Sequence, residues 1–263
     1  MILLLLACSD PVSQPDVTRD DRGDPRDTAV SEDTGADTGT PGDTDQDTEE
    51  PQDTDDSPIT VTRSTITVNT SCAMSAVLFE PSREGERLVV LAHGFARTSA
   101  NMEGWAEALA AEGLTVVTPD LCHATMWDTD HVQNGRDLAD LAATLGHDEV
   151  VYAGHSAGGL AALLAADQDP SAVGWFGLDP VDSEGLGAAV RLSVPATALV
   201  GEPSECNASA SGADLDGEIK HISGADHCDF ESPTDWMCTT FCPDAGGDVE
   251  DTIRAQLLEG ALR

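Results

Sequence analysis

The sequence predicts an α/β fold for residues 58–263, with a mostly parallel central sheet flanked by helices and no large lid. Short apolar runs alternate with stretches whose apolar residues recur at helical spacing. Nearly continuous apolar runs are typical of strands that are buried on both faces of a parallel sheet. The alternation of such strands with helices requires crossover connections, which form an open α/β sheet.

Two segments at the start of this region predict antiparallel edge strands, and later apolar runs predict the parallel strands. "ITVTRSTITV" alternates β-forming residues and "MSAVLFEP" clusters them, which favours edge strands. The expected edge strands are residues 59–68 and 74–81, the expected parallel strands are residues 87–94, 114–120, 149–156, 173–179 and 196–202, and a late strand is expected at residues 218–222.

Amphipathic spacing predicts the helices between and after these strands. Met102, Trp105 and Leu109 fall on one helical face, and Gly113 follows them as a stop signal. Leucines recur in the same way before Gly146. The expected helices are residues 101–113, 128–146, 159–168 and 248–263.

The first 57 residues are expected to lie outside the folded domain. Residues 9–57 are rich in Asp and Thr and almost free of large apolar residues after Val30, which predicts a disordered acidic linker. Residues 1–8 end in Ala-Cys, as the lipobox of a bacterial lipoprotein signal does. Cys8 is therefore the expected lipid attachment site and membrane anchor, and the expected location is the bacterial cell envelope, or the medium if the protein is secreted.

This signal segment departs from the usual pattern. Its apolar run is short and no positive residue precedes it. The departure predicts that the natural start lies further upstream. The alternative to a lipoprotein signal is an apolar N-terminal stub.

The net charge of the chain argues against one class of binding partner. The formal net charge is −37, from 49 acidic and 12 basic residues. Nucleic acid is not an expected partner, because phosphate binding needs clustered Lys and Arg. The sequence leaves the oligomeric state open.

Cysteines predict cross-links in the domain. Besides Cys8 the chain has six cysteines, and an even number in an exported domain indicates up to three disulfides whose pairing the sequence leaves open. A zinc site formed by His227, Cys228, Cys238 and Cys242 is the alternative, although the spacings do not match the usual ligand patterns. The six cysteines are Cys72, Cys122, Cys206, Cys228, Cys238 and Cys242.

The segment Gly154-His155-Ser156-Ala157-Gly158 places a serine where a predicted strand ends and a predicted helix begins. In this context the Gly-x-Ser-x-Gly pattern predicts that Ser156 is a nucleophile on a sharp, strained turn, with its hydroxyl clear of the sheet. The two outer glycines leave room for the close approach of strand and helix. An ordinary strand-to-helix turn is the alternative.

Two backbone amides are expected to form an oxyanion hole beside this serine. One donor is the amide of Ala157, directly after the nucleophile. The second is expected in the loop after residues 87–94, where Phe95 is the first choice and Ala96 the second. His93, in the same loop, is expected to brace it.

A serine nucleophile needs a base, and the base needs an orienting acid. In this architecture the order along the chain is serine, acid, histidine, and only His221 and His227 follow Ser156. We expect His227 to be the base, because it lies on a loop just past the late strand whereas His221 lies inside that strand.

Two residues compete for the role of the acid. Asp179 and Glu202 both end predicted strands, where sites form in open α/β sheets. The usual position of the acid, after the later strand, favours Glu202. Asp182 and Glu205 are more remote alternatives.

Taken together, these motifs resemble those of a known enzyme superfamily. From about residue 59 to residue 263 the chain resembles the α/β-hydrolases, and among them the chlorophyllase and cutinase-like (polyester hydrolase) branch. "LAHGFARTSANM", "GHSAGG", "GLDPVD" and "GADHCDF" occur in the order found in those enzymes. The resemblance implies that Asp179, in the "DPV" segment, is the acid, which places it ahead of Glu202. The cysteine-rich end "CDFESPTDWMCTTFC" departs from the branch, so the substrate does not carry over.

The predicted function is a serine carboxylic-ester hydrolase. Ser156, Asp179 and His227 would act through an acyl-enzyme on a lipid, a polyester or another small ester. This chemistry requires no metal or organic cofactor. The alternatives are a lysophospholipase- or peptidase-type serine hydrolase and a catalytically silent cell-surface binding module on the same fold.

Overall fold

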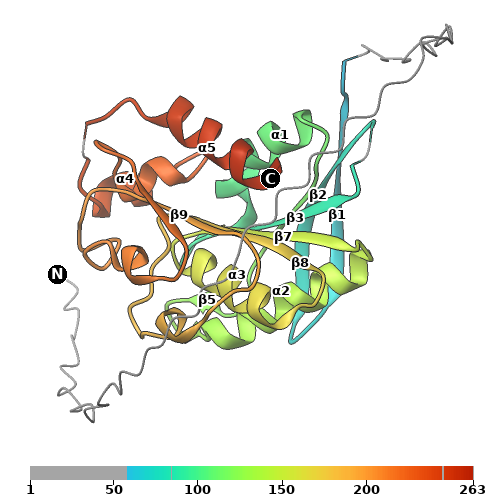
Figure 1. Cartoon of the computed structure of the whole chain (residues 1–263), viewed down its shortest axis with the longest axis horizontal. Helices are drawn as coiled ribbons and strands as arrows, with labels where there is room; N and C mark the ends of the chain where they lie inside the picture. Colours follow the sequence, from blue (N-terminus) through green and yellow to red (C-terminus); the bar gives the residue numbers. More distant parts are fainter. Residues whose placement is uncertain (1–57, 84, 245, 263) are drawn as a thin grey trace, which may run out of the picture. The chain divides into compact units, whose positions relative to one another are not determined.

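The computed structural model describes residues 58–83, 85–244 and 246–262, and these residues build one eight-stranded sheet with helices on both faces (Figure 1). The strand order is β1-β2-β4-β3-β7-β8-β9-β10. Strands β1 and β2 pair antiparallel with their neighbours, whereas all the other pairs in this sheet are parallel. The predicted α/β class with a mostly parallel central sheet is confirmed.

The strands form where the predicted apolar runs lie. Side chains of β3 from Leu88 to Ala92 are fully buried, as expected for a strand covered on both faces. A separate hairpin of two short strands, β5 and β6, was not predicted. The bounds are β1 Val61–Asn69, β2 Ala73–Pro81, β3 Arg87–Ala92, β4 Thr115–Pro119, β5 Ala124–Thr125, β6 Asp128–Thr129, β7 Glu149–His155, β8 Ala172–Leu178, β9 Ala196–Val200 and β10 Glu218–His221.

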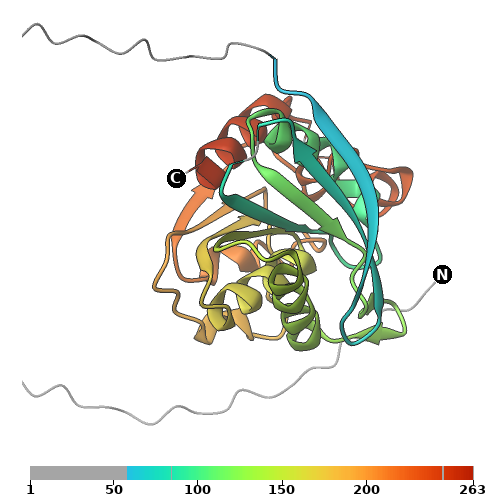
Figure 2. The ribbon, with the colours of Figure 1, turned by 90° about the vertical axis from the view of Figure 1, so that its right-hand side faces the viewer.

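The four long helices cover the sheet in two pairs. Helices α1 (Glu103–Ala111) and α5 (Glu250–Leu262) lie on one face, and α2 (His131–Leu145) and α3 (Ala157–Gln168) lie on the other (Figures 1 and 2). Each pair buries its apolar residues in its own hydrophobic core. Among the described residues no large lid covers the sheet.

Helix α2 begins later than the spacing predicted. Asp128 and Thr129 pair in the hairpin, and Asp130 is the N-cap, because its carboxylate accepts a hydrogen bond from the Gln133 amide at 2.8 Å. The helix ends as predicted at Gly146, which adopts a left-handed conformation with φ 76°. Local capping by Asp130 therefore overrode the helical spacing over residues 128–130.

Helix α3 packs tightly between the sheet and α2. It consists mostly of Ala, Gly and Leu, and most of its residues are buried. A Cβ at Gly135 of α2 would lie 2.9 Å from the Cβ of Leu164, so this glycine permits the close contact of the two helices. The tight packing fixes the position of the amino end of α3, where Ser156 lies.

The C-terminal third contains structure that the sequence did not predict. A short helix, α4 (Trp236–Phe241), lies in the cysteine-rich segment, and His227 begins a 3-10 helix, η4 (His227–Phe230). Three disulfides are present, which join Cys72 to Cys122, Cys206 to Cys242 and Cys228 to Cys238. The zinc alternative is thus wrong for the oxidised protein, because paired cysteines offer no thiolate ligands.

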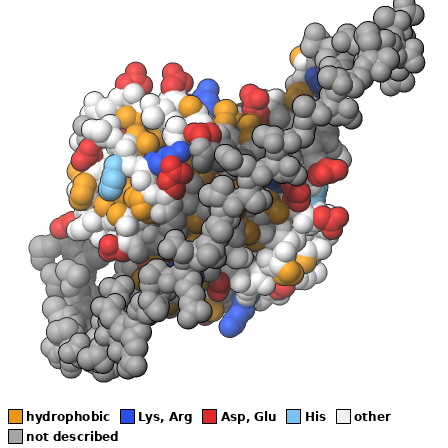
Figure 3. Space-filling model, in the orientation of Figure 1, with side chains coloured by type: hydrophobic (Ala, Val, Ile, Leu, Met, Phe, Trp, Pro, Cys, Tyr) orange, Lys and Arg blue, Asp and Glu red, His pale blue; other side chains and the backbone are white. Residues whose placement is uncertain are grey.

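The expected lipoprotein segment, Cys8 and the acidic linker all lie outside the described residues. Among the described helices, none has the length and apolar content needed to span a bilayer. Acidic side chains are scattered over the face seen in Figure 3, with few basic ones between them.

Burial predicts that Leu141 is a main contributor to the stability of the α2–α3 side. Leu141 is fully buried, whereas Val132 on the same helix is 38% exposed. Leu141→Ala should lower the free energy of unfolding by about 3 kcal/mol, because it leaves a cavity. The control Val132→Ala should change it by less than about 0.5 kcal/mol. Urea denaturation measures both, and equal effects would contradict this description of the core.

Candidate active site

Ser156 lies at the turn between β7 and α3, in a backbone conformation that is rare for serine. Its φ is 55° and its ψ is −124°. The neighbouring glycines explain how this turn forms. A Cβ at Gly154 would lie 2.5 Å from the carbonyl oxygen of Gly158, and a Cβ at Gly158 would lie 2.2 Å from that of His93. Only glycine fits at both positions, and the strained turn follows from this close backbone approach.

The imidazole of His227 joins the serine to a carboxylate. Its Nε2 lies 3.0 Å from Oγ of Ser156, and its Nδ1 lies 2.6 Å from Oδ2 of Asp179. The side chains of all three residues are buried. Because a carboxylate only accepts, Nδ1 carries the proton and Nε2 is free to accept the serine proton. The structure therefore brings together three residues that are far apart in the sequence.

Glu202 does not take part in this arrangement. It lies just past β9, is exposed, and its Oε1 accepts a hydrogen bond from the Gly224 amide at 2.9 Å. Asp182 caps a different turn, where its carboxylate accepts from the amides of residues 186–188. His221 is exposed at the end of β10. Of the candidates that the sequence left open, Asp179 and His227 are the two that the structure brings together beside Ser156.

A family model described as the alpha/beta hydrolase fold matches residues 87–174. The matched segment runs from β3 into β8 and includes the turn that carries Ser156. The sheet order and its antiparallel start agree with this match. The chain has an α/β-hydrolase fold. A comparison with curated proteins found no match.

Asn207 is a residue of the hydrolase site that the sequence analysis missed. Its Nδ2 donates to Oδ2 of Asp179 at 3.1 Å and to the carbonyl of Glu202 at 2.9 Å, and it is fully buried. The Gly201 amide donates to the other oxygen of Asp179 at 3.0 Å. Asn207 thus orients the carboxylate toward His227, but no motif in the sequence marks it.

The hydrolase site opens into a small pocket beside the nucleophile. Its volume is about 160 Å³, and the disulfide between Cys206 and Cys242 forms part of its wall. Phe95 also lines it and is 42% exposed. The other lining residues are Gly94, Arg97, His155, Ser156 and His227.

Within the described part of the chain, two of the predicted oxyanion donors have no hydrogen-bond acceptor for their amides. Ala157 is the first residue of α3, so its amide has no partner within the helix. Phe95 lies across the pocket, in the loop after β3. The second choice, Ala96, is excluded because its amide donates to the carbonyl of Ala124 at 2.7 Å.

His93 braces the loop that carries Phe95. Its Nδ1 donates to the carbonyl of Gly94 at 2.8 Å, and its Nε2 accepts from the Leu121 amide at 3.0 Å. Both ring nitrogens are used, and burial lowers the pKa of His93. His93 therefore stays neutral and links the ends of β3 and β4.

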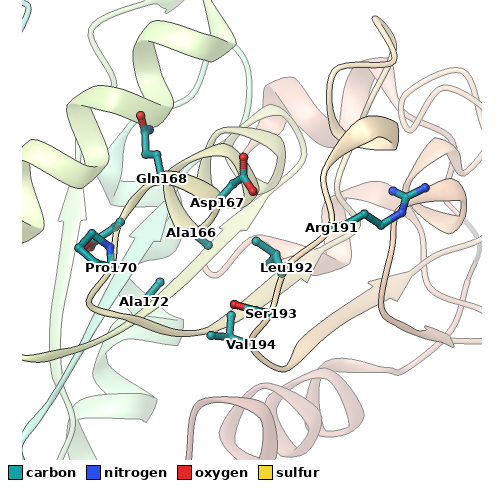
Figure 4. A pocket seen from close by; sticks show the side chains of 10 residues that line it. Ala166, Asp167, Gln168, Pro170, Ala172, Arg191, Leu192, Ser193 and Val194 are labelled. Carbon is teal, nitrogen blue, oxygen red and sulfur yellow. The ribbon is translucent and has the colours of Figure 1, made fainter.

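A larger cavity lies elsewhere in the hydrolase. Its volume is about 440 Å³, and it lies between the end of α3 and the segment that leads into β9 (Figure 4). Because Asp169, Pro170 and Val194 precede β8 and β9, this cavity is at the amino ends of the strands. Active sites in open α/β sheets lie at the carboxyl ends, so the pocket at Ser156 is the candidate.

The close contact at Gly158 predicts that this position tolerates no side chain. Gly158→Ala should destabilise the protein by about 3 kcal/mol, because the new methyl group would meet the His93 carbonyl. The control is Gly146→Ala, where no atom lies within 4 Å and only the positive φ of 76° is unfavourable; it should cost about 1 kcal/mol. Thermal denaturation distinguishes the two, and the opposite order would contradict the crowding at Gly158.

Proposed function

We propose that this protein is a serine carboxylic-ester hydrolase. The single observation that carries the proposal is the position of the His227 ring, 3.0 Å from Oγ of Ser156 and 2.6 Å from Oδ2 of Asp179. Serine, imidazole and carboxylate in this order form the charge arrangement that activates a hydroxyl for attack on an acyl carbon.

In the proposed reaction His227 acts first as a base and then as an acid. Nε2 of His227 takes the proton of Ser156 while Oγ attacks the ester carbonyl carbon. Asp179 accepts a hydrogen bond from Nδ1 and stabilises the positive imidazolium. The imidazolium then gives its proton to the departing alcohol, and an acyl-Ser156 ester remains. A water molecule that His227 deprotonates cleaves this ester and regenerates the hydroxyl.

The negative charge that develops on the substrate oxygen needs donors that are already in place. Phe95 lines the pocket from the loop after β3, and Ala157 begins α3 directly after Ser156, which also lines the pocket. The amino end of α3 adds the favourable field of a helix terminus. Such preorganised donors lower the activation free energy by about 3 kcal/mol for each donor.

The pocket favours a small group on one side of the ester bond. A volume of about 160 Å³ holds about five non-hydrogen atoms at about 30 Å³ each. A lipid, a polyester or another small ester fits the proposal, in line with the resemblance to chlorophyllases and cutinase-like enzymes. The complete Ser-His-Asp geometry favours an active enzyme over a silent binding module, which does not need all three groups.

We further propose that the enzyme acts outside the cytoplasm. The three disulfides support an oxidising compartment. Anchoring through a lipid on Cys8 is a separate proposal, which rests on the lipobox-like sequence. The mass of the protein isolated from native membranes tests it, because an unmodified Met1 would exclude the lipid.

Ser156→Ala should abolish ester hydrolysis. The variant lacks the nucleophile, and the rate with p-nitrophenyl butyrate should fall by at least about a thousandfold. The loss should appear in kcat, with an unchanged melting temperature as the control for folding. An unchanged rate in this variant would exclude the mechanism.

Asp179→Asn and Glu202→Gln distinguish the two possible acids. Asparagine at 179 favours the wrong tautomer of His227, and kcat should fall by about 10⁴-fold. Glu202→Gln should retain nearly full activity, because Glu202 is exposed and bonds the Gly224 amide. Steady-state kinetics with p-nitrophenyl butyrate measure both, and a collapse in Glu202→Gln alone would assign the acid to Glu202.

A further inference from the structure

A second buried carboxylate lies behind the catalytic histidine. Glu231 follows η4, four positions after His227, and its side chain is completely buried. Its Oε1 accepts a hydrogen bond from Nε of Arg97 at 2.6 Å. Arg97 is 10% exposed and belongs to the loop after β3 that also carries Phe95. One ion pair therefore joins the His227 segment to the loop of the expected oxyanion donor.

The ring of His155 lies between this carboxylate and His227. Nε2 of His155 donates to the backbone carbonyl of His227 at 3.0 Å, and the two rings lie 4.5 Å apart. Nδ1 of His155 lies 3.6 Å from Oε1 of Glu231. Since His155 directly precedes Ser156, the Glu231 carboxylate touches or approaches all three segments that form the site.

The contact between His155 and Glu231 is chemically unfavourable as it stands. Because Nε2 of neutral His155 carries the proton, Nδ1 presents a lone pair to an oxygen that also only accepts. Among the described residues, Nδ1 of His155 is the one buried side-chain nitrogen or oxygen without a hydrogen-bond partner. Burial lowers the pKa of His155 well below its ordinary value, so the ring does not relieve the conflict by taking a proton.

An ion pair that served the fold alone would not need this arrangement. A glutamine at 231 would also accept a hydrogen bond from Arg97. The native carboxylate adds a negative charge, and its Oε1 lies 3.6 Å from Nδ1 of His155, whose ring packs against that of His227. Unfavourable buried polar contacts of this kind are expected at functional sites.

We infer that Glu231 is a positioning residue of the triad, which holds the His227 segment and the Arg97 loop together and stabilises the positive charge on His227 across the ring of His155. The inference rests on the proposed function. Asp179 acts on Nδ1 of His227 through a direct hydrogen bond. Glu231 acts through space, across the ring of His155, which is tilted by 42° relative to the ring of His227.

Other charged groups around His227 do not provide this interaction. Asp226 and Asp229 lie on its own segment, but the carboxylate of Asp226 caps η4 and that of Asp229 accepts from the Asp226 amide. Arg97 is a cation that pairs with Glu231, and burial lowers the pKa of His93. Oδ1 of Asp235 also lies 3.7 Å from Nη1 of Arg97, but the side chain of Asp235 is 38% exposed to solvent.

The test is Glu231→Gln, with Asp235→Asn as the matched control. Both changes remove one negative charge near Arg97, and asparagine at 235 can still cap α4. With p-nitrophenyl butyrate, Glu231→Gln should lower kcat by about tenfold and leave KM within about twofold. It should also move the acidic limb of the pH profile of kcat/KM to lower pH, because a positive His227 is then less stabilised. Asp235→Asn should do neither.

Each outcome of these kinetic measurements either supports or overturns the role of Glu231. Unchanged kcat and an unchanged acidic limb in Glu231→Gln would overturn it, and so would equal effects in Asp235→Asn. If the Glu231→Gln variant does not fold, the double variant with Arg97→Gln and Glu231→Gln, which has no charge at either position, is measured in its place. Wild-type kinetics in the double variant would overturn the inference. A wild-type protein without esterase activity, or an active Ser156→Ala variant, would refute the proposed function itself and with it this role of Glu231.

Discussion

The site depends on a close backbone contact at Gly158, where any side chain would clash with the neighbouring chain. At the end of β7 the chain turns into α3 so closely that the peptide of His93 lies where a Cβ of residue 158 would be, 2.2 Å from its carbonyl oxygen. This crowding holds Ser156 at a positive φ of 55° and lifts its hydroxyl away from the sheet. The tight packing of α3 against α2 and the sheet supplies the force that maintains the strain.

Parallel strands explain why the other parts arrive at the same place. Strands β3, β7, β8 and β9 all end at one edge of the sheet, so the residues that follow them meet there although they are far apart in the sequence. The loop after β3 brings Phe95 and Arg97, the end of β8 brings Asp179, and the loop after β9 brings Asn207. His227 reaches the same edge after β10.

The segment between β10 and α5 is held by cross-links more than by regular structure. Short helices and turns prevail there, and two disulfides, Cys206–Cys242 and Cys228–Cys238, tie this region to the loop of Asn207 and to itself. Because a cross-link limits the conformations of the unfolded chain, such a region can stay ordered with a small core. The disulfide at residue 206 also forms a wall of the pocket, which links the stability of the region to the shape of the site.

The sequence by itself determined the fold class, most strands and helices, and the serine turn, because these depend on local periodicity and on glycine at fixed spacing. Tertiary structure decided what local patterns do not encode. Asp179 and Glu202 look alike in sequence, and only the direction of each side chain separates them. Asn207 and Glu231 carry no motif, since their contacts are with residues 28 and 134 positions away. The pairing of six cysteines and the start of α2 likewise depended on which groups the folded chain places within bonding distance.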